Sequence, residues 1–472
     1  MPPRTRTLVA IVLVVIVGVA GATTYLLLTR PMGSAPGPGP TGPVVPAFCP
    51  TGAGADEAGN WTTYHQDNSR AGVEATGPVT GATPMWGGPV SLDGQVYAEP
   101  LVCGDAVYVA TEENMVYAIN ATTGSILWSD ALGSSVPQSD LPCGDINPTG
   151  ITGTPVIDTA TGILYVVAFL AQNLHHELFG LSVTNGTIES QVAVDAPGST
   201  PANEQQRGAL ALANGFVYVP YGGLFGDCAQ YWGFVVGAPV NGSSVLRSYQ
   251  VPTTREAGIW AAGGVQVAPN GSLFVATGNG ASRSTYDFGD SVIELSPTLA
   301  EVGAFAPVNW LSLNENDQDL GSLNPTLLPD GNVFMAGKEG VGYLLDGADL
   351  GGVGGQLGEN DVCAGAYGGT AHVGPTVFVP CTNGLFAVAT TATNLSVAWS
   401  ATGFDAGSPI VTGDVVWAVN ISTSDLLGFN LTTGAIAFSF PLAGSDHFLS
   451  PTATPDSLLV AGGDELYAYA LS

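Results

Sequence analysis

Positively charged side chains are rare in this chain, and the few present mark the region where a ligand would be bound. The sequence has nine Lys and Arg residues against 39 Asp and Glu. Guanidinium and ammonium groups bind carboxylates and other anions, and a guanidinium does so through a planar fork of donors. The bases that come after the N-terminal segment are Arg70, Arg207, Arg247, Arg255, Arg283 and Lys338.

Acidic and aromatic side chains accompany these bases along the chain. Trp260 and Tyr367 offer flat surfaces for stacking, and Asp319 offers a carboxylate. With Arg207, Arg255, Arg283 and Lys338 they form the candidate site for an anionic or hydroxylated ligand. The alternative is that the bases neutralise buried acids and pin long loops. The other polar residues of this group are Asp227, Asp287, Asp290, Asp317, Asp361, His175, His176 and His447.

Two sets of residues could be metal ligands. Asp287, Asp290 and Asp317 carry the hard oxygen atoms that calcium prefers, although their spacing is not that of an EF-hand. Acidic turn residues are common, so calcium stays a hypothesis. His175 and His176 are adjacent, and adjacent residues of a strand point to opposite faces, which argues against a zinc site.

The composition excludes several classes of function. A formal net charge of −30 leaves no basic face for nucleic acid. The sequence contains neither a G-x-S-x-G motif nor a phosphate-binding loop. Few bases and many acids also suggest an acidic exterior that becomes nearly neutral at low pH, so we expect tolerance of acid.

A repeated pattern of strands must position the candidate residues. Its first copy, VYVATEENMVYAINATTGSILW, runs from Val107 to Trp128. The later copies begin at Leu164, Val217, Leu273, Val333, Val377, Val416 and Leu458. Their spacing of roughly 39 to 60 residues is typical of four-stranded propeller blades. The sequence therefore predicts an all-β, eight-bladed β-propeller over about residues 59–472, or seven blades if residues 333–356 do not form a complete one.

The repeat also predicts how the ring closes and which loops share a face. The last copy ends at Ser472 before an outer strand, so we expect the segment around Met85-Trp86-Gly87 to supply it. Loops that lead into an inner strand, and loops that join the second and third strands, emerge on one face of a propeller. Arg207 and Arg255 fall in the first kind of loop, and Arg283 and Lys338 in the second.

The N-terminal region and the cysteines indicate export. Residues 1–30 contain an apolar stretch, Leu8 to Leu28, that reads as a membrane anchor or a signal peptide, and residues 31–58 form a Pro/Gly/Ala-rich linker. We expect a monomer outside the cytoplasm, with sequons such as Asn60 permitting glycosylation. An even number of cysteines favours disulfides. The pairs expected are Cys363 with Cys381, Cys143 with Cys228, and Cys49 with Cys103.

The repeat resembles that of the pyrroloquinoline-quinone (PQQ)-like β-propellers. The resemblance is carried by Tyr108-Val109, Tyr117 to Asn120, Thr123-Gly124 and Leu127-Trp128. The superfamily includes quinoprotein alcohol dehydrogenases and the assembly lipoprotein BamB. The segment from Trp61 to Gly72 is also similar to the start of many such chains. The resemblance extends to an exported subgroup of these propellers, over about residues 59–472.

The resemblance implies two functions of different kinds. One is a binding or scaffold module that presents its loop-rich face to a protein partner or a small ligand. The other is an alcohol or sugar dehydrogenase that uses PQQ and calcium. The chain departs from the dehydrogenases because it has no Cys-Cys pair to clamp the quinone and no C-x-x-C-H haem motif. We therefore favour the binding module, with its catalytic residues, if any, unassigned.

Overall fold

The computed structural model describes Phe48, Cys49 and residues 59–472. The expected N-terminal helix, and the linker apart from Phe48 and Cys49, lie outside the described residues. Within the described part of the chain, no helix is both long and apolar enough to cross a membrane. The described residues belong to one compact unit, Pro46–Ser472.

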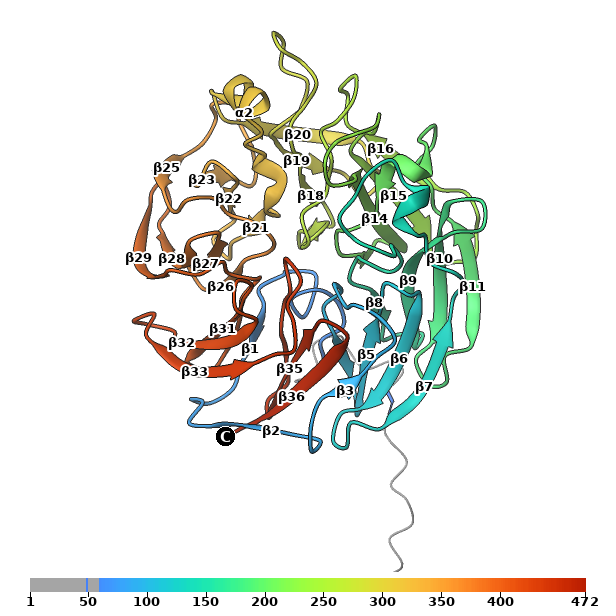
Figure 1. The fold of residues 1–472 in the computed structure, drawn as a ribbon. Coiled ribbons are helices and arrows are strands. Elements are labelled where there is room, and N and C mark those ends of the chain that lie inside the picture. The colour runs from blue at the N-terminus through green and yellow to red at the C-terminus, as the bar shows by residue number, and fades with distance from the viewer. Residues whose placement is uncertain (1–47, 50–58) are drawn as a thin grey trace, which may run out of the picture. The chain divides into compact units, whose positions relative to one another are not determined.

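Eight antiparallel sheets are arranged as blades around a central axis (Figure 1). The predicted eight-bladed propeller is confirmed, and the weak copy around residues 333–356 forms a complete fifth blade. Blade 1 consists of β4 (Leu101–Cys103), β5 (Ala106–Ala110), β6 (Met115–Asn120) and β7 (Ile126–Ala131). Blade 2 consists of β8 (Val156–Asp158), β9 (Ile163–Leu170), β10 (His175–Ser182) and β11 (Ile188–Ala193).

The next four blades repeat this order. Blade 3 is β13 (Ala211–Ala213), β14 (Phe216–Gly223), β15 (Phe234–Pro239) and β16 (Arg247–Gln250). Blade 4 is β17 (Gln266–Val267), β18 (Leu273–Ala276), β19 (Val292–Leu295) and β20 (Glu301–Ala306). Blade 5 is β21 (Thr326–Leu327), β22 (Asn332–Ala336), β23 (Val341–Asp346) and β25 (Gly358–Asp361). Blade 6 is β26 (Ala371–Val373), β27 (Thr376–Cys381), β28 (Gly384–Thr390) and β29 (Leu395–Thr402).

The last two blades contain the N-terminal strands. Blade 7 is β30 (Ile410–Thr412), β31 (Val415–Asn420), β32 (Asp425–Asn430) and β33 (Ile436–Pro441), with β1 (Val73–Glu74) parallel to β30. Blade 8 is β34 (Thr452–Ala453), β35 (Ser457–Gly462) and β36 (Glu465–Leu471). Its outer strand comes from the other end of the chain, because β2 (Ala82–Pro84) and β3 (Val90–Ser91) both pair with β36.

The predicted closing strand is therefore in place, shifted by a few residues. The Met85 amide still donates to the Ala468 carbonyl at 2.8 Å. The strand ends there because Trp86 has a left-handed backbone (φ 59°), which breaks the ladder. Closure leaves the ring without a free edge at this position.

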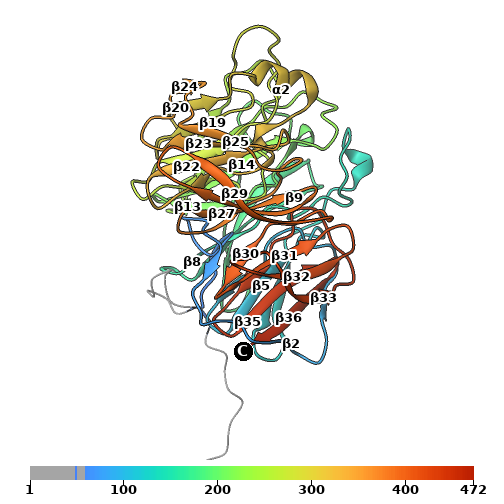
Figure 2. The same cartoon turned by 90° about the vertical axis from the view of Figure 1, so that its left-hand side faces the viewer.

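Two short strands, one helix and three 3-10 turns lie beside the main strands of the blades. The strands β12 (Glu204–Gln205) and β24 (Gly352–Val353) extend blades 3 and 4, and α2 (Trp310–Asn316) lies in the loop after β20. Three short 3-10 turns are η1 (Gln138–Asp140), η2 (Pro201–Asn203) and η3 (Leu320–Ser322). Figure 2 shows the blades from the side, with α2 near the upper end of the view.

A tryptophan fastens one blade to the next at three positions around the ring, between blades 8 and 1, 1 and 2, and 6 and 7. The Nε1 atoms of Trp86, Trp128 and Trp399 donate to the carbonyls of Ala121, Val183 and Leu431, at 2.9, 3.0 and 2.9 Å. The receiving turns carry a glycine because a Cβ there would come within 2.7 Å of the indole. The Gly-containing turn, which is Thr-Thr-Gly at Gly124 and Gly434 and Thr-Asn-Gly at Gly186, thus forms a recurring contact with the Trp of the neighbouring blade.

The segment before β1 fills the centre of the ring. Arg70 is fully buried, and its guanidinium donates to the carbonyls of Tyr64, Leu210 and Val265 at 2.9 to 3.0 Å. Glu99, at the start of blade 1, accepts from the Trp61 Nε1 atom and from the His65 amide. We call the segment Trp61–Arg70 the plug.

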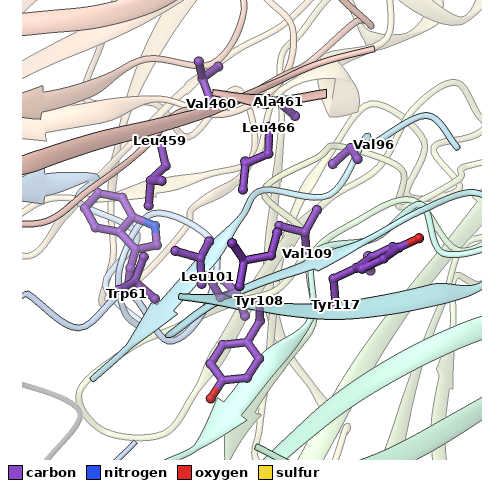
Figure 3. Packing of buried hydrophobic residues seen from close by; sticks show 14 of the residues in the cluster. Trp61, Val96, Leu101, Tyr108, Val109, Tyr117, Leu459, Val460, Ala461 and Leu466 are labelled. Atoms are coloured by element: carbon purple, nitrogen blue, oxygen red, sulfur yellow. The ribbon is translucent and has the colours of Figure 1, made fainter. Parts of the chain in front are cut away.

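The two chain ends meet in the largest core cluster (Figure 3). Trp61 packs there with Leu101 and Val109 of blade 1 and with Leu459 and Leu466 of blade 8. All five side chains are buried. Burial of a large apolar side chain stabilises by about 1.5 to 3 kcal/mol, so this cluster contributes substantially to holding the first and last blades together.

Replacing Arg70 by Met should destabilise the ring strongly. The change takes the guanidinium donor from the Val265 carbonyl and leaves the Leu210 carbonyl with only the Thr63 hydroxyl. Removing one partner of such a buried charged network costs about 3 to 5 kcal/mol. The measurement is urea unfolding. Arg247→Met is the matched control, because Arg247 is an exposed residue of β16. Its guanidinium lies over the Phe216 ring, 4.2 Å from the ring centroid. Its loss should cost about 1 kcal/mol or less. Equal losses in the two variants would contradict the role of the plug.

Buried carboxyls should make the protein more stable on mild acidification. Burial raises the pKa of Glu99, of Glu112 and of Glu204 to about 8, whereas an unfolded Glu titrates near about 4.3. The folded chain therefore binds protons that the unfolded chain does not, and the stabilisation is complete below the unfolded pKa and lost as the pH rises through about 8. The free energy of unfolding should rise as the pH falls from about 8.5 to 6.5.

Histidine opposes this gain at lower pH. Burial lowers the pKa of His65 to about 3, so below about 6.5 the unfolded histidine takes up a proton that the folded one refuses. The gain should therefore slow or reverse there. Urea unfolding at constant ionic strength measures both regions. In Glu204→Gln the free energy of unfolding should depend less steeply on pH above about pH 6.5 than in the unmodified chain. An unchanged slope would refute the raised pKa of Glu204.

Candidate functional site

A cleft of about 530 Å³ opens on the loop-rich face, where the loops of several blades meet. Its walls come from loops leading into inner strands and from loops joining second and third strands, which is the face predicted from the repeat. We call this cleft the mouth. The residues that characterise it are Arg207, Asp227, Trp260, Asp317, Lys338 and Phe448.

Arg207 lies in the wall of the mouth, in the loop before β13. Its guanidinium donates to the Gln205 side chain at 3.1 Å and lies 3.8 Å from an Asp145 oxygen. It also lies over the rings of Trp260 and Phe448, at 5.9 and 5.5 Å from their centroids. Burial lowers the pKa of Arg207, and Asp145 counteracts that effect. The guanidinium is thus held by the protein itself.

Lys338 lies in the loop between β22 and β23, with its Nζ atom 5.9 Å from the centroid of the Trp260 ring. Its Nζ atom lies 2.9 Å from Asp317 and 2.5 Å from Asp319. These two carboxylates raise the pKa of the lysine above its ordinary value, against the effect of burial. Asp319 also accepts from the Asn279 amide at 2.6 Å. The lysine therefore carries a full charge that two neighbouring acids neutralise.

Aromatic rings cross the mouth in a row. The Phe448 ring lies between those of Trp260 and Tyr367, with centroids 6.1 and 6.2 Å away. The Nε2 atom of its neighbour His447 lies 3.1 Å from a carboxylate oxygen of Asp145. The rings provide apolar surface, and the imidazole is held by a carboxylate.

The structure brings together five of the seven residues proposed for ligand binding. These are Arg207, Trp260, Asp319, Lys338 and Tyr367. Arg255 and Arg283 lie outside the mouth. Arg255 pairs with Glu256, and Arg283 donates to the Asn314 carbonyl at 3.1 Å. Both tie down loops, which is the alternative that the sequence left open for these bases.

The three calcium candidates lie in different settings. Asp290 is fully buried and accepts from the Leu320 amide, and burial together with Asp319 raises its pKa well above the ordinary range. Asp287 accepts from Thr253 and from the Ser282 amide. Asp317 is paired with Lys338. Among the described residues, no three His, Cys, Asp or Glu side chains are grouped so that they could hold a metal ion.

His175 and His176 also lie away from the mouth. The His175 ring contacts Glu177 at 3.0 Å, and the His176 ring contacts Asp195 at 3.1 Å and stacks on Phe169. Their rings have different partners, in agreement with the alternation expected of a strand.

Two of the three disulfides fasten loops of the mouth. The expected pairs are present, and Cys143–Cys228 joins the loop of Asp145 to the loop of Asp227. Cys363–Cys381 ties the loop of Tyr367 to the end of β27. The walls of the mouth are therefore crosslinked, although they contain little regular structure.

The sequence pattern did not single out Asp145, Phe225, Tyr231 and Phe448 as residues of the mouth. A signal for two of its acids was present, because Cys143-Gly144-Asp145 and Gly226-Asp227-Cys228 place an Asp beside each cysteine of one disulfide. Phe448 gave no such signal. Its left-handed backbone (φ 69°), which turns the ring into the mouth, depends on the folded loop.

A second cleft, of about 790 Å³, opens among the hairpin turns on the other side of the plug. Asp67, Asn68 and Ser69 of the plug line it, together with turns such as the one at Asn214. None of the residues proposed for ligand binding from the sequence lines this second cleft.

The mouth does not fit PQQ, a flat quinone that carries three carboxylates. Phe448, Arg207 and Lys338 already lie around Trp260, which is the stacking surface that a quinone would need. Both cations are engaged by acids. The disulfides join cysteines 18 to 85 residues apart, so none is the adjacent pair expected of a quinone clamp.

Comparisons with known proteins agree with the repeat. The family model described as outer membrane protein assembly factor BamB matches residues 82–220. No curated protein sequence matches the chain.

Three solved structures illustrate the likeness in fold. A quinohemoprotein alcohol dehydrogenase, ADHIIG from Pseudomonas putida HK5, is 13% identical with a TM-score of 0.72, over 90% of this chain and 82% of that one. A europium-containing methanol dehydrogenase is 14% identical with a TM-score of 0.69, over 88% and 99%. BamB from Moraxella catarrhalis is 14% identical with a TM-score of 0.55, over 83% and 98%.

At such identities the likeness extends to the fold alone, and the relatives include both dehydrogenases and an assembly factor. The resemblance read from the repeat is nevertheless confirmed by the family model and by the ring itself. The chain is an eight-bladed β-propeller with a PQQ-like repeat, and its residues 82–220 match the BamB family model.

Proposed function

We propose that the protein is a binding module that acts outside the cytoplasm and holds a ligand or a partner segment in its mouth. The observation that carries the proposal is the mouth itself, a cleft of about 530 Å³ with aromatic walls and charged side chains. Clefts of this size that combine apolar walls with a few polar groups are the usual sites of ligand binding. The family model that matches residues 82–220 describes an outer membrane protein assembly factor.

The disulfides support a location outside the cytoplasm. All six cysteines are paired. Disulfides form and persist in oxidising compartments and are rare in the cytosol. An apolar N-terminal stretch, Leu8 to Leu28, is consistent with export by a signal peptide or with an anchor in the membrane.

The side chains of the mouth support binding without catalysis. His447 and Asp145 form a pair that could act as a base, yet none of the described Ser, Thr and Cys side chains lines the mouth to serve as its nucleophile. The dehydrogenase alternative requires a quinone, which these residues do not fit. The two cations of the mouth, Arg207 and Lys338, are instead paired with the protein's own acids.

A binding screen with the full chain tests this function. Peptides, saccharides and small organic ions are screened by thermal shift, and dye reduction is followed with PQQ, calcium and a panel of alcohols. Phe225→Ala removes an exposed ring of the mouth, and Val245→Ala is the matched control in the turn between β15 and β16. We expect a ligand whose affinity falls about tenfold, or about 1.4 kcal/mol, in the first variant only. Sustained dye reduction with an alcohol would contradict the proposal.

Removing the Cys143–Cys228 disulfide should loosen the mouth and leave the ring folded. In the Cys143→Ser/Cys228→Ser variant, we expect faster amide hydrogen exchange in the loops around Asp145 and Asp227, with the inner strands unchanged. A native disulfide of a small secreted domain contributes about 2 to 5 kcal/mol. Cys49→Ser/Cys103→Ser is the control, because it should affect blade 1 and not the mouth. Unchanged exchange in the two loops would disprove the role assigned to the crosslink.

A further inference from the structure

The mouth presents two of its acids, Asp227 and Asp317, outward and keeps its positive groups recessed. The Asp317 side chain is 70% exposed, and Asp227 is exposed at the tip of its loop. The Arg207 and Lys338 side chains are only 11% and 17% exposed. A ligand that approaches from solvent therefore meets carboxylates before it meets a cation.

The balance of charge in the mouth is also negative. Its lining contains the carboxylates Asp145, Asp227, Asp317 and Asp319 against Arg207 and Lys338, which is four negative charges against two positive ones. His447 is held by Asp145 and cannot reverse that balance. The whole chain carries −30, so the long-range field has the same sign as the mouth.

The acids at the rim retain capacity for hydrogen bonds. Asp227 accepts one bond, from the Tyr231 hydroxyl at 2.6 Å. Asp317 receives Lys338 and the Asn279 amide group on one and the same oxygen, Oδ1. An ionised carboxylate has about four acceptor positions, so each rim acid can accept from an incoming N–H donor.

Apolar surface stands beside these acids. Phe225 is 64% exposed and lies two residues from Asp227, and Tyr367 lines the same cleft. The long stems of Lys and Arg bury their methylene groups against such surface while the charged end reaches an acid. Rings beside carboxylates are therefore suited to a basic side chain.

The floor of the mouth has room for one further polar group. A void of about 10 Å³ adjoins it, lined by Arg207, His447 and Phe448 and by the plug residue Tyr64. The buried hydroxyls of Tyr64 and Thr152 face this void without a hydrogen-bond partner of good geometry among the described residues. Unpartnered buried hydroxyls indicate that a water or a ligand group completes the site.

We propose that the mouth receives a basic segment of a partner protein, with a Lys or Arg side chain between the rim acids Asp227 and Asp317 and its stem against Phe225. The inference rests on the proposed binding function and names the chemistry of the ligand. It replaces the anionic ligand expected from the sequence, because the two cations that would have held an anion are recessed and paired. The chain has a formal net charge of −30, so electrostatic attraction brings a basic segment to the mouth and favours it over an acidic segment.

Substitution of both rim acids by Asn tests the proposal without disturbing the loops. Asp227 and Asp317 have left-handed backbones (φ 48° and 53°), which Asn tolerates as well as Asp. Asp130→Asn/Glu189→Gln removes the same charge from the outer strands β7 and β11 and is the matched control. The probes are dye-labelled peptides of alternating Lys and Gly and of alternating Glu and Gly, together with a labelled maltooligosaccharide, and binding to the full chain is read by fluorescence anisotropy.

We expect the lysine peptide to bind, to lose about tenfold in affinity in Asp227→Asn/Asp317→Asn, and to lose about twofold or less in the control pair. Raising the salt concentration should weaken binding to the unmodified chain. Equal losses in both variants would show only the effect of net charge and would overturn the proposal.

The other outcomes separate this inference from the proposed function. If the glutamate peptide or the saccharide binds instead, with an affinity that Phe225→Ala lowers, the mouth is a binding site and the basic ligand is wrong. If none of the three probes binds, the basic ligand is overturned as well. Dye reduction with PQQ and alcohol would overturn the binding function itself.

Discussion

The buried guanidinium of Arg70 is the constraint on which the ring depends. A charge in the core must satisfy its donors without water, and Arg70 does so by reaching carbonyls of the plug and of blades 3 and 4. Glu99 of blade 1 holds the plug from the other side through Trp61 and His65. The His65 ring adds Thr370 of blade 6 and Ser450 before blade 8. One short segment therefore bonds to inner elements around the whole axis.

This arrangement explains where a ligand can go. The plug closes the middle of the channel and divides it into a mouth on one side and a second cleft on the other. Tyr64 belongs to the plug and also reaches the floor of the mouth. The element that closes the ring thus shapes the bottom of the site, and the loops of several blades supply only its walls.

The likeness to the structurally similar dehydrogenases lies in the fold, and the function has to be inferred from the side chains of this chain. The strands and the tryptophan contacts build a ring that can serve binding or catalysis. In this chain Phe448 packs against Trp260 in the wall of the mouth, the cations of the mouth are neutralised by acids, and its loops are crosslinked by two disulfides. These features favour recognition of a partner over the holding of a flat, anionic quinone.

The sequence by itself predicted a propeller of eight blades, with seven as the alternative, the closure of the ring by its N-terminal segment and the face on which Arg207 and Lys338 lie. It could do so because strand alternation and turn residues are local properties that recur with a period. Only the tertiary structure decided that Arg255 and Arg283 bind their own loops, and that Arg207 and Lys338 are recessed behind Asp227 and Asp317. The direction of a side chain and the identity of its partner depend on how loops from distant blades pack together. That packing cannot be predicted from the sequence of any single repeat.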